Sequence, residues 1–433
     1  MIQFRRNIYF LLFALVSLSG FAEEKKEAAK PAPKKAEKSY TFDEHWKKVM
    51  TPIAGESDFL KALLLGKAQF SFRLGYEHSN FDDPGDLDPA EGFNLQTRFT
   101  YKSGEFNGIS FLIQPQFTTN FVEDFRWPSG GDPAHDVIAD PDKTRIHQGY
   151  FDLTFIPDTV IRAGIQEILL DDVRFIGNVG WRQGAQSFTA VTVTNKSIEN
   201  LKLFAGYVDR IHNIFYQDLE DEELILLNAA YTYAETHNIS AFAYLRDGTV
   251  DAQDSATYGI RGWGSEGMFL YDATLATQTD YRDGDHDAFY YSVFGAVKFE
   301  KLQVGLGYSV ISGGSDAEDR FSTLFGTAHK FNGWADQFLG TGGGLPGGLE
   351  DFWIELKSAK LPWGITGALQ YHIFTAEDSS AVGGADDYGT EFDIVFSKKL
   401  SNNVTALIKY AHYDSEDFGQ DEDVFWLRAM IKF

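Results

Sequence analysis

Residues 424–433 read VFWLRAMIKF, and this stretch decides the fold that the sequence predicts. In a β-strand, side chains alternate between two faces. One face would then be wholly apolar and consist of Phe425, Leu427, Ala429, Ile431 and Phe433. In an outer membrane, lipid covers such a face, and the opposite face, here with Arg428 and Lys432, turns to the lumen. The stretch therefore predicts the closing strand of a membrane β-barrel. The alternative is the last strand of a soluble β-sandwich.

Strand-like alternation recurs from residue 67 to the C-terminus. In the first segment, Phe70 and Phe72 alternate with Ser71 and Arg73. The predicted strands cover residues 67–79, 92–102, 108–121, 144–156, 159–168, 187–195, 200–209, 223–235, 238–247, 255–264, 267–280, 287–299, 302–312, 350–359, 364–375, 387–398, 403–414 and 424–433. We therefore expect an all-β fold, a transmembrane antiparallel β-barrel of about 18 strands at residues 67–433.

The links between these segments alternate between short and long. Pro157-Asp158 and Glu300-Lys301 are tight links, whereas the longest links, at 122–143, 169–186 and 313–349, carry no strand alternation. Outer-membrane barrels show this order because short turns face the periplasm and long loops face outwards. An even number of strands also returns both termini to the periplasm. We expect the protein in the cell outer membrane of a Gram-negative bacterium.

The N-terminal part falls into three segments of different composition. Residues 1–22 have the basic start, the apolar run and the small-residue end of a secretory signal peptide. Residues 23–41 are rich in Lys, Ala and Pro, which predicts a flexible periplasmic tether or, alternatively, an electrostatic docking arm. Residues 42–66 show a short helical pattern, and we expect this segment to pack at the periplasmic mouth or to plug part of the lumen.

A barrel of this size has a lumen too wide for its own side chains to fill. We therefore expect a water-filled lumen, narrowed by long loops that fold inwards. The chain contains no cysteine, which excludes a disulfide framework and a lipoprotein anchor.

Two stretches resemble the alginate-export family of outer-membrane barrels. They are residues 162–183, with RAGIQ followed by DDVRFIGNVGWRQ, and residues 324–339, LFGTAHKFNGWADQFL. The resemblance implies an eighteen-stranded barrel that passes an anionic polysaccharide or smaller solutes, with loop arginines lining a constriction. Ile165 and Thr189 depart from the family pattern, which has arginine and aspartate there. These departures weaken the case for alginate as the solute.

The formal net charge of −25 would oppose anion passage if the acids lined the lumen. The acids instead gather in predicted outer loops such as 82–88, 132–142 and 283–287, whereas the polar strand faces are mostly basic. Rings of Arg and Lys select anions in pores. We expect these residues to line the pore or contact the solute: Arg73, Arg98, Arg162, Arg174, Arg182, Arg246, Arg261, Lys298 and Arg428. The sequence predicts a passive diffusion channel with a modest anion preference.

Arg174 and Arg182 belong to the predicted 169–186 loop, so we expect them at the constriction, where planar guanidinium groups suit carboxylates. The alternative is that these arginines pin the loop to acids of the wall, such as Asp152 or Glu391.

Aromatic residues offer a second kind of solute contact. Trp353 and Trp426 face the lumen by register, where they would stack on sugar rings or join the aromatic girdle near a mouth. For residues 329–334, inward packing of a long loop and contact with a ligand are both open.

Other chemistry has weaker support. Three carboxylates have a spacing reminiscent of calcium loops: Asp283, Asp285 and Asp287. The following glycine and the distal glutamate of an EF-hand are missing, so we expect no cofactor.

His372 and Glu355 lie on neighbouring predicted strands without a convincing serine partner, so we expect no enzyme. A non-conducting structural barrel or adhesin is the remaining alternative.

The expected partners follow from the barrel interpretation. We expect contacts with outer-membrane lipid and lipopolysaccharide, with the barrel-assembly machinery through Phe433, and with an anionic solute or polysaccharide. We expect a monomer that binds no nucleic acid.

Overall fold

The computed structural model describes residues 41–81, 87–339 and 344–433. The predicted signal peptide and almost all of the predicted tether lie outside these residues. Thr41 caps helix α2 (Phe42–Ala54), and α3 (Asp58–Leu64) follows. Short 3-10 helices occur in the links: η1 (Asp251–Gln253), η2 (Ala317–Asp319), η3 (Ala328–Lys330), η4 (Pro362–Gly364) and η5 (Ser379–Val382). In the described ranges, every helix is too short or too polar to cross a membrane.

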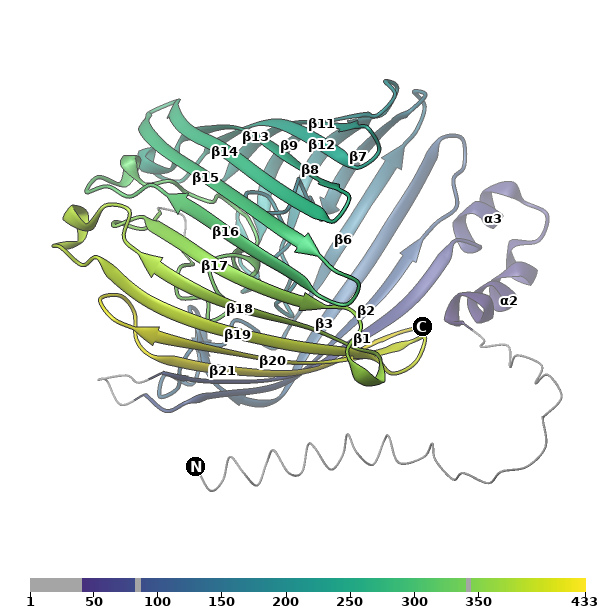
Figure 1. The fold of residues 1–433 in the computed structure, drawn as a ribbon. Coiled ribbons are helices and arrows are strands. Elements are labelled where there is room, and N and C mark those ends of the chain that lie inside the picture. The colour runs from purple at the N-terminus through teal and green to yellow at the C-terminus, as the bar shows by residue number, and fades with distance from the viewer. Residues whose placement is uncertain (1–40, 82–86, 340–343) are drawn as a thin grey trace, which may run out of the picture. The chain divides into compact units, whose positions relative to one another are not determined.

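Eighteen antiparallel strands close into one barrel, which confirms the predicted fold class (Figure 1). They are β1 (Lys67–Phe81), β2 (Ala90–Lys102), β3 (Ile109–Asp124), β6 (Lys143–Leu153), β7 (Thr159–Gln166), β8 (Ser187–Asn195), β9 (Leu201–His212), β11 (Glu223–Tyr233), β12 (His237–Asp247), β13 (Ser255–Glu266), β14 (Phe269–Tyr281), β15 (Gly284–Lys298), β16 (Gln303–Ile311), β17 (Leu349–Ser358), β18 (Ile365–Thr375), β19 (Asp387–Lys399), β20 (Val404–Ser415) and β21 (Glu422–Lys432). Pairing of β1 with β21 closes the ring. The two-residue β10 (Asp218–Leu219) only extends the pairing of β9, and β4 (Arg126–Trp127) pairs with β5 (Gly130–Gly131).

The closing strand β21 has the two faces that its sequence predicts. Phe433 continues the ladder beyond β21 through two backbone hydrogen bonds with Phe70, of 2.9 and 3.3 Å. On the inner face, Trp426 and Arg428 are buried, because loops inside the barrel cover them. Large apolar side chains on the outer faces stay exposed, for example Phe117, Phe151, Leu275 and Leu306. Lipid covers such a surface in a membrane barrel, whereas a soluble sandwich would bury it.

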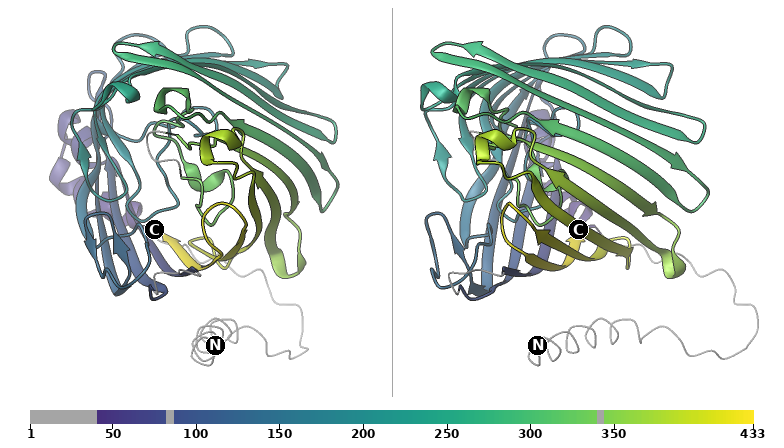
Figure 2. Two further views of the ribbon diagram at one scale, coloured as in Figure 1. Left: turned by 90° about the vertical axis from the view of Figure 1, so that its left-hand side faces the viewer. Right: turned by 60° about the vertical axis from the view of Figure 1, so that its left-hand side comes forward.

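Two long links fold into the barrel. We call residues 167–186 loop A, and we call the described part of the second link, residues 312–339 and 344–348, loop B. Loop A joins β7 to β8, and loop B joins β16 to β17. They meet through a bridge between Ile176 and Phe325 and a 3.0 Å backbone hydrogen bond from Gly177 to Phe325. Figure 2 shows green segments of the chain within the ring of strands. The expected inward folding is therefore found for these two loops.

Helices α2 and α3 pack on the outer side of the wall (Figure 1). The ring of Phe42 lies 4.6 Å from that of Phe70 on β1, and the ring of Trp46 lies 5.3 Å from that of Tyr101 on β2. The Tyr101 hydroxyl donates to the carbonyl of Leu63 at 2.6 Å. Since Phe70 and Tyr101 belong to the outward apolar faces, the helices do not plug the lumen.

Candidate functional site

A cavity of about 650 Å³ lies inside the barrel, where loops A and B meet the wall. Its lining includes four carboxylates and four cations: Asp172, Asp272, Asp351, Glu355, Arg174, Lys330, Lys357 and Lys409. Aromatic rings supply much of the remainder: Trp181, Tyr290, Phe294, Phe331, Trp334 and Trp353. The formal charges of the cavity therefore balance, although the strand pattern predicted a mainly basic lumen.

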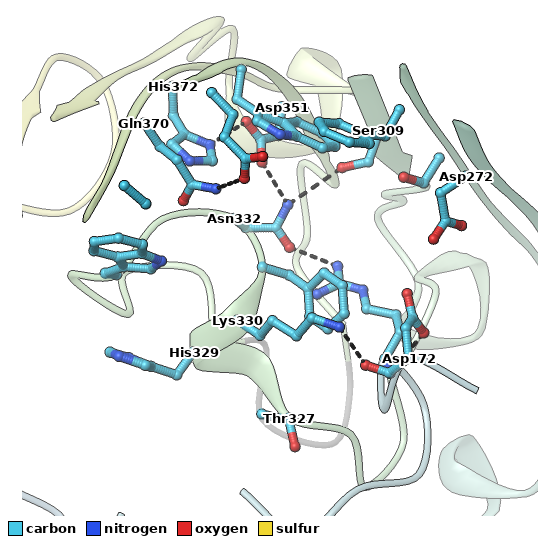
Figure 3. Close-up of a pocket in the computed structure, with 18 of the residues that line it drawn as sticks. Asp172, Asp272, Ser309, Thr327, His329, Lys330, Asn332, Asp351, Gln370 and His372 are labelled. Carbon is cyan, nitrogen blue, oxygen red and sulfur yellow. Dashed lines mark hydrogen bonds and ion pairs between the residues drawn. The ribbon is translucent and has the colours of Figure 1, made fainter. Parts of the chain in front are cut away.

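Asn332 connects loop B to the wall and to loop A (Figure 3). Its amide nitrogen donates to the Asp351 carboxylate at 3.1 Å and to the Ser309 hydroxyl at 3.4 Å. Its carbonyl oxygen accepts a 2.6 Å hydrogen bond from Arg174 of loop A. The position of Arg174 at the cavity therefore depends on a residue 158 positions later in the chain.

The residue after Asn332 must be glycine for loop B to reach the wall. Gly333 has a φ of +82°, and a Cβ there would lie 2.2 Å from a carboxylate oxygen of Glu391. The close approach lets Glu391 accept hydrogen bonds from the backbone amides of Trp334 and Ala335, the latter at 2.8 Å. Glu391 therefore holds the loop B backbone, and it is not one of the residues that line the cavity.

His329 seats the same loop on β20. Its buried imidazole stacks on Trp181 with the ring centroids 4.5 Å apart. Nδ1 lies 2.9 Å from the Asp336 carboxylate, and Nε2 lies 2.6 Å from Nζ of Lys409. An ammonium group can only donate, so Nε2 accepts and the neutral ring carries its proton on Nδ1. Burial lowers the pKa of His329 to about 3, and Lys409 adds to this effect while Asp336 opposes it.

Two of the predicted pore arginines hold loop A from the wall. Arg73 on β1 donates to the Gln183 side chain at 2.8 Å and to the Gly180 carbonyl at 2.7 Å. Arg428 on β21 donates to the Trp181 carbonyl at 2.5 Å, and its guanidinium carbon lies 3.6 Å from the centroid of the Trp181 ring. Both guanidinium groups are therefore covered by the loop that they bind.

Arg182 of loop A also serves as an anchor. It donates to both carboxylate oxygens of Glu77, at 2.7 and 3.0 Å, and lies 3.3 Å from Asp336 of loop B. Burial disfavours its charge, but the surrounding carboxylates outweigh burial and raise the pKa of Arg182 above its ordinary value. Arg182 does not line the cavity.

The remaining strand arginines each bind a neighbouring side chain: Arg98 with Gln116 at 2.6 Å, Arg162 with Asp152 at 2.7 Å, Arg246 with Glu222 at 2.7 Å and Arg261 with Asp272 at 2.9 Å. Lys298 is exposed at the end of β15. Of the nine residues predicted to line the pore, Arg174 alone lines this cavity. Arg73, Arg182 and Arg428 hold the inner loops, whereas Arg162 lines a second cavity, of about 590 Å³.

The two tryptophans lie inside the barrel, so a place in an outer girdle is wrong for both. Trp353 lines the cavity and stacks between Phe294 and His372, with centroid distances of 6.2 and 6.0 Å. Trp426 is 1% exposed and packs edge-on against Trp181, with centroids 5.6 Å apart. Trp353 is therefore partly exposed to the cavity, whereas Trp426 supports loop A.

Sequence reasoning missed Asp351 and the part played by Asn332. Asp351 is two residues before Trp353 on β17, so the period-two pattern placed it on the lumen face. Its partners were not predictable, because Asn332 and His372 lie on other elements. The 329–334 stretch packs inwards, as one alternative predicted, and five of its residues line the cavity, so contact with a ligand stays a prediction.

Among the described residues, the structure shows no group of three or more His, Cys, Asp or Glu side chains placed to hold a metal ion. The segment considered for calcium is largely strand, since β15 starts at Gly284. His286, between two of the three aspartates, lies with Nδ1 2.8 Å from the Glu318 carbonyl.

No protein-family model and no curated protein matches the chain. Solved structures do match its fold. OccK11 (OpdR) of Pseudomonas aeruginosa is 16% identical with a TM-score of 0.62, and the match covers 84% of this chain and 95% of that one. OccAB4 of Acinetobacter baumannii is 13% identical with a TM-score of 0.66, covering 84% and 98%. OccK1 (OpdK) of Pseudomonas aeruginosa is 13% identical with a TM-score of 0.65, again covering 84% and 98%.

The chain has the fold of the Occ and Opd outer-membrane porins. At these identities the similarity shows the fold alone. It agrees with the predicted outer-membrane barrel, but these three structures are Occ and Opd proteins rather than alginate exporters. The shared fold does not identify the solute, so any proposal about it must rest on the residues of this chain's own cavity.

Proposed function

We propose that the protein is a passive diffusion channel for small hydrophilic solutes in the outer membrane, and that the cavity between loops A and B is its constriction. The main observation in support of this proposal is the cavity itself. It is a charged and aromatic space inside a barrel whose outer surface is apolar, and side chains of two inward loops and several strands converge on it. Charges between low-dielectric walls act strongly on a permeant, so groups placed there control passage.

A small carboxylate is the solute that we propose first. Lys330 reaches the cavity from loop B, and its ammonium group donates to the backbone carbonyl of Asp172 at 2.8 Å. Arg174 of loop A lines the same cavity, and the two cations lie 4.7 and 4.9 Å from the centroid of the Phe331 ring. A carboxylate could replace the neutral Asn332 oxygen or Asp172 carbonyl that each cation now binds. Trp353 offers a ring surface in the same cavity. One of the similar structures is OpdK with vanillate, and vanillate is therefore a suitable first probe.

The anion preference is weaker in this cavity than the strand pattern suggested. Its four carboxylates offset its four cations, and most other arginines are engaged with loop carbonyls or acids. An anionic polysaccharide such as alginate follows from the sequence resemblance alone. Passage of such a chain would require loops A and B to leave the contacts that hold them to the wall.

Planar-bilayer recording of the purified full-length protein tests the proposal. We expect stable single-channel conductance, a reversal potential near zero or slightly on the anion side in a salt gradient, and concentration-dependent block by vanillate or a uronate. A clear cation preference would contradict the carboxylate proposal while leaving the channel intact. A barrel that inserts and shows no conductance would contradict the channel itself and favour a structural barrel or an adhesin.

A further inference from the structure

Helix α2 has an apolar stripe that the barrel covers only in part. Phe42, Trp46, Val49 and Ile53 follow at helical spacing, so their side chains share one side of the helix. Phe42 and Trp46 pack against aromatic rings of β1 and β2. Val49 and Ile53 are left 48% and 61% exposed. On α3, Phe59 is 52% exposed as well.

These exposed side chains continue the outer apolar surface of the barrel. Phe59 lies 5.4 Å, centroid to centroid, from Phe106 in the turn between β2 and β3. Ring contacts run from Trp46 through Tyr101 and Phe111 to Phe151, which is 57% exposed on the outer face of β6. The helices therefore stand at the end of the wall with the short turns, in line with the surface that lipid covers (Figure 1).

The charges of the two helices do not favour an anionic partner. Residues 42–64 carry three lysines and four acids: Lys47, Lys48, Lys61, Asp43, Glu44, Glu56 and Asp58. Lys47 is also paired with Asp43 at 2.8 Å. Attraction to anionic head groups is therefore weak, and burial of the apolar stripe is the available driving force.

We propose that the α2–α3 hairpin is an interfacial membrane element. Val49, Ile53 and Phe59 insert among the acyl chains of the leaflet next to the short turns, which the strand topology predicts to be the periplasmic leaflet. Lys48, on another side of α2, stays in water. The hairpin thus extends the lipid contact of β1–β3 sideways along the membrane surface, because its stripe is continuous with theirs. This inference is independent of whether the barrel conducts.

Single cysteines test the proposal cleanly, because the chain contains no native cysteine. Val49→Cys, Ile53→Cys and the matched control Lys48→Cys are labelled with a polarity-sensitive fluorophore in the full-length protein, with one barrel per phosphatidylcholine nanodisc. We expect labels at 49 and 53 to shift to the blue and to be quenched by nitroxide-bearing lipid chains. The label at 48 should be quenched by aqueous iodide. Replacing part of the lipid with phosphatidylglycerol should leave all three signals unchanged.

Equal iodide quenching at positions 48, 49 and 53 would overturn the proposal. Protection that grows with the number of barrels per disc would also overturn it, because a second copy would then cover the stripe. As a label-free check, Ile53→Asp should accelerate chymotrypsin digestion of the hairpin in nanodiscs several-fold, whereas Lys48→Asp should not. Barrel integrity in each variant is confirmed by its heat-dependent shift on a detergent gel.

Discussion

The guanidinium of Arg182 in loop A donates to both carboxylate oxygens of Glu77 on β1, at 2.7 and 3.0 Å. The two side chains are 11% and 5% exposed, so this ion pair is largely shielded from water. Asp336 of loop B lies 3.3 Å from the same guanidinium. One arginine therefore joins the wall and both inner loops.

Removing the charge of Arg182 should release loop A. Arg182→Gln leaves the buried carboxylate of Glu77 with Arg428 alone, at 4.0 Å, and removing one partner from a buried ion pair typically costs about 3–5 kcal/mol. We expect larger and noisier single-channel currents and easier denaturant unfolding. Arg210→Gln is the matched control, because Arg210 pairs with the exposed Glu220 at 3.2 Å and such pairs are worth about 0–1 kcal/mol. Equal currents in wild type and Arg182→Gln would mean that loop A does not narrow the path.

Acid should loosen loop B through His329. The pKa of His329 falls from 6.5 to about 3 on folding, so the unfolded loop binds more protons between these values. The contribution of neutral His329 to the free energy of unfolding is complete above pH 6.5. It is lost as the pH falls below that value, by up to about 1.4 kcal/mol per pH unit. Protonation of Nε2 would also set two cations side by side, since Lys409 donates to that atom. We expect current noise to increase from pH 7 to pH 5.

His329→Gln is the control for the acid effect. A glutamine amide can donate to Asp336 and accept from Lys409, so it replaces both hydrogen bonds without titrating. Bilayer recordings of this variant should be steady across the same pH range. If the variant and the wild type responded equally to acid, another group would be responsible.

Trp353 should bind aromatic or sugar solutes in the cavity. Trp353→Ala removes a ring surface, and a stacking contact is worth about 1 kcal/mol, so block by vanillate should weaken roughly fivefold. Trp363→Ala provides the comparison, because Trp363 is 83% exposed in the turn between β17 and β18 and does not line the cavity. Blocker titrations at fixed voltage measure both variants. Unchanged block in Trp353→Ala would remove this ring from the solute path.

Lys330 should set part of the ion selectivity. Lys330→Gln removes one of the four cations from a cavity with four carboxylates, so the reversal potential in a salt gradient should shift towards cation preference. Lys360→Gln removes a lysine of equal charge from an exposed turn, where it lies 3.8 Å from Glu300, and salt screens such a position. We expect no shift there. Identical shifts in both variants would show that net charge, and not the cavity, determines selectivity.

The sequence by itself determined the barrel, because strand alternation is a local pattern. In residues 424–433, the odd or even position of a residue along the strand decides which face its side chain takes. The same rule placed Trp353, Arg428 and Lys409 on the lumen side. Counting the alternating segments gave about eighteen strands, and the order of short and long links predicted which end of the barrel faces the periplasm. None of this required knowledge of distant contacts.

Only the tertiary structure decided what the lumen residues do. Arg73 meets Gln183 across 110 positions of sequence, and Arg174 meets Asn332 across 158. Such pairs form when loops A and B fold into the ring, and no local period encodes where a loop will land. The strand pattern therefore shows that an arginine faces the lumen, but it does not show whether its partner there is water or a loop carbonyl. The balance of charge in the cavity, and the packing of α2 outside the wall, follow from these long-range contacts.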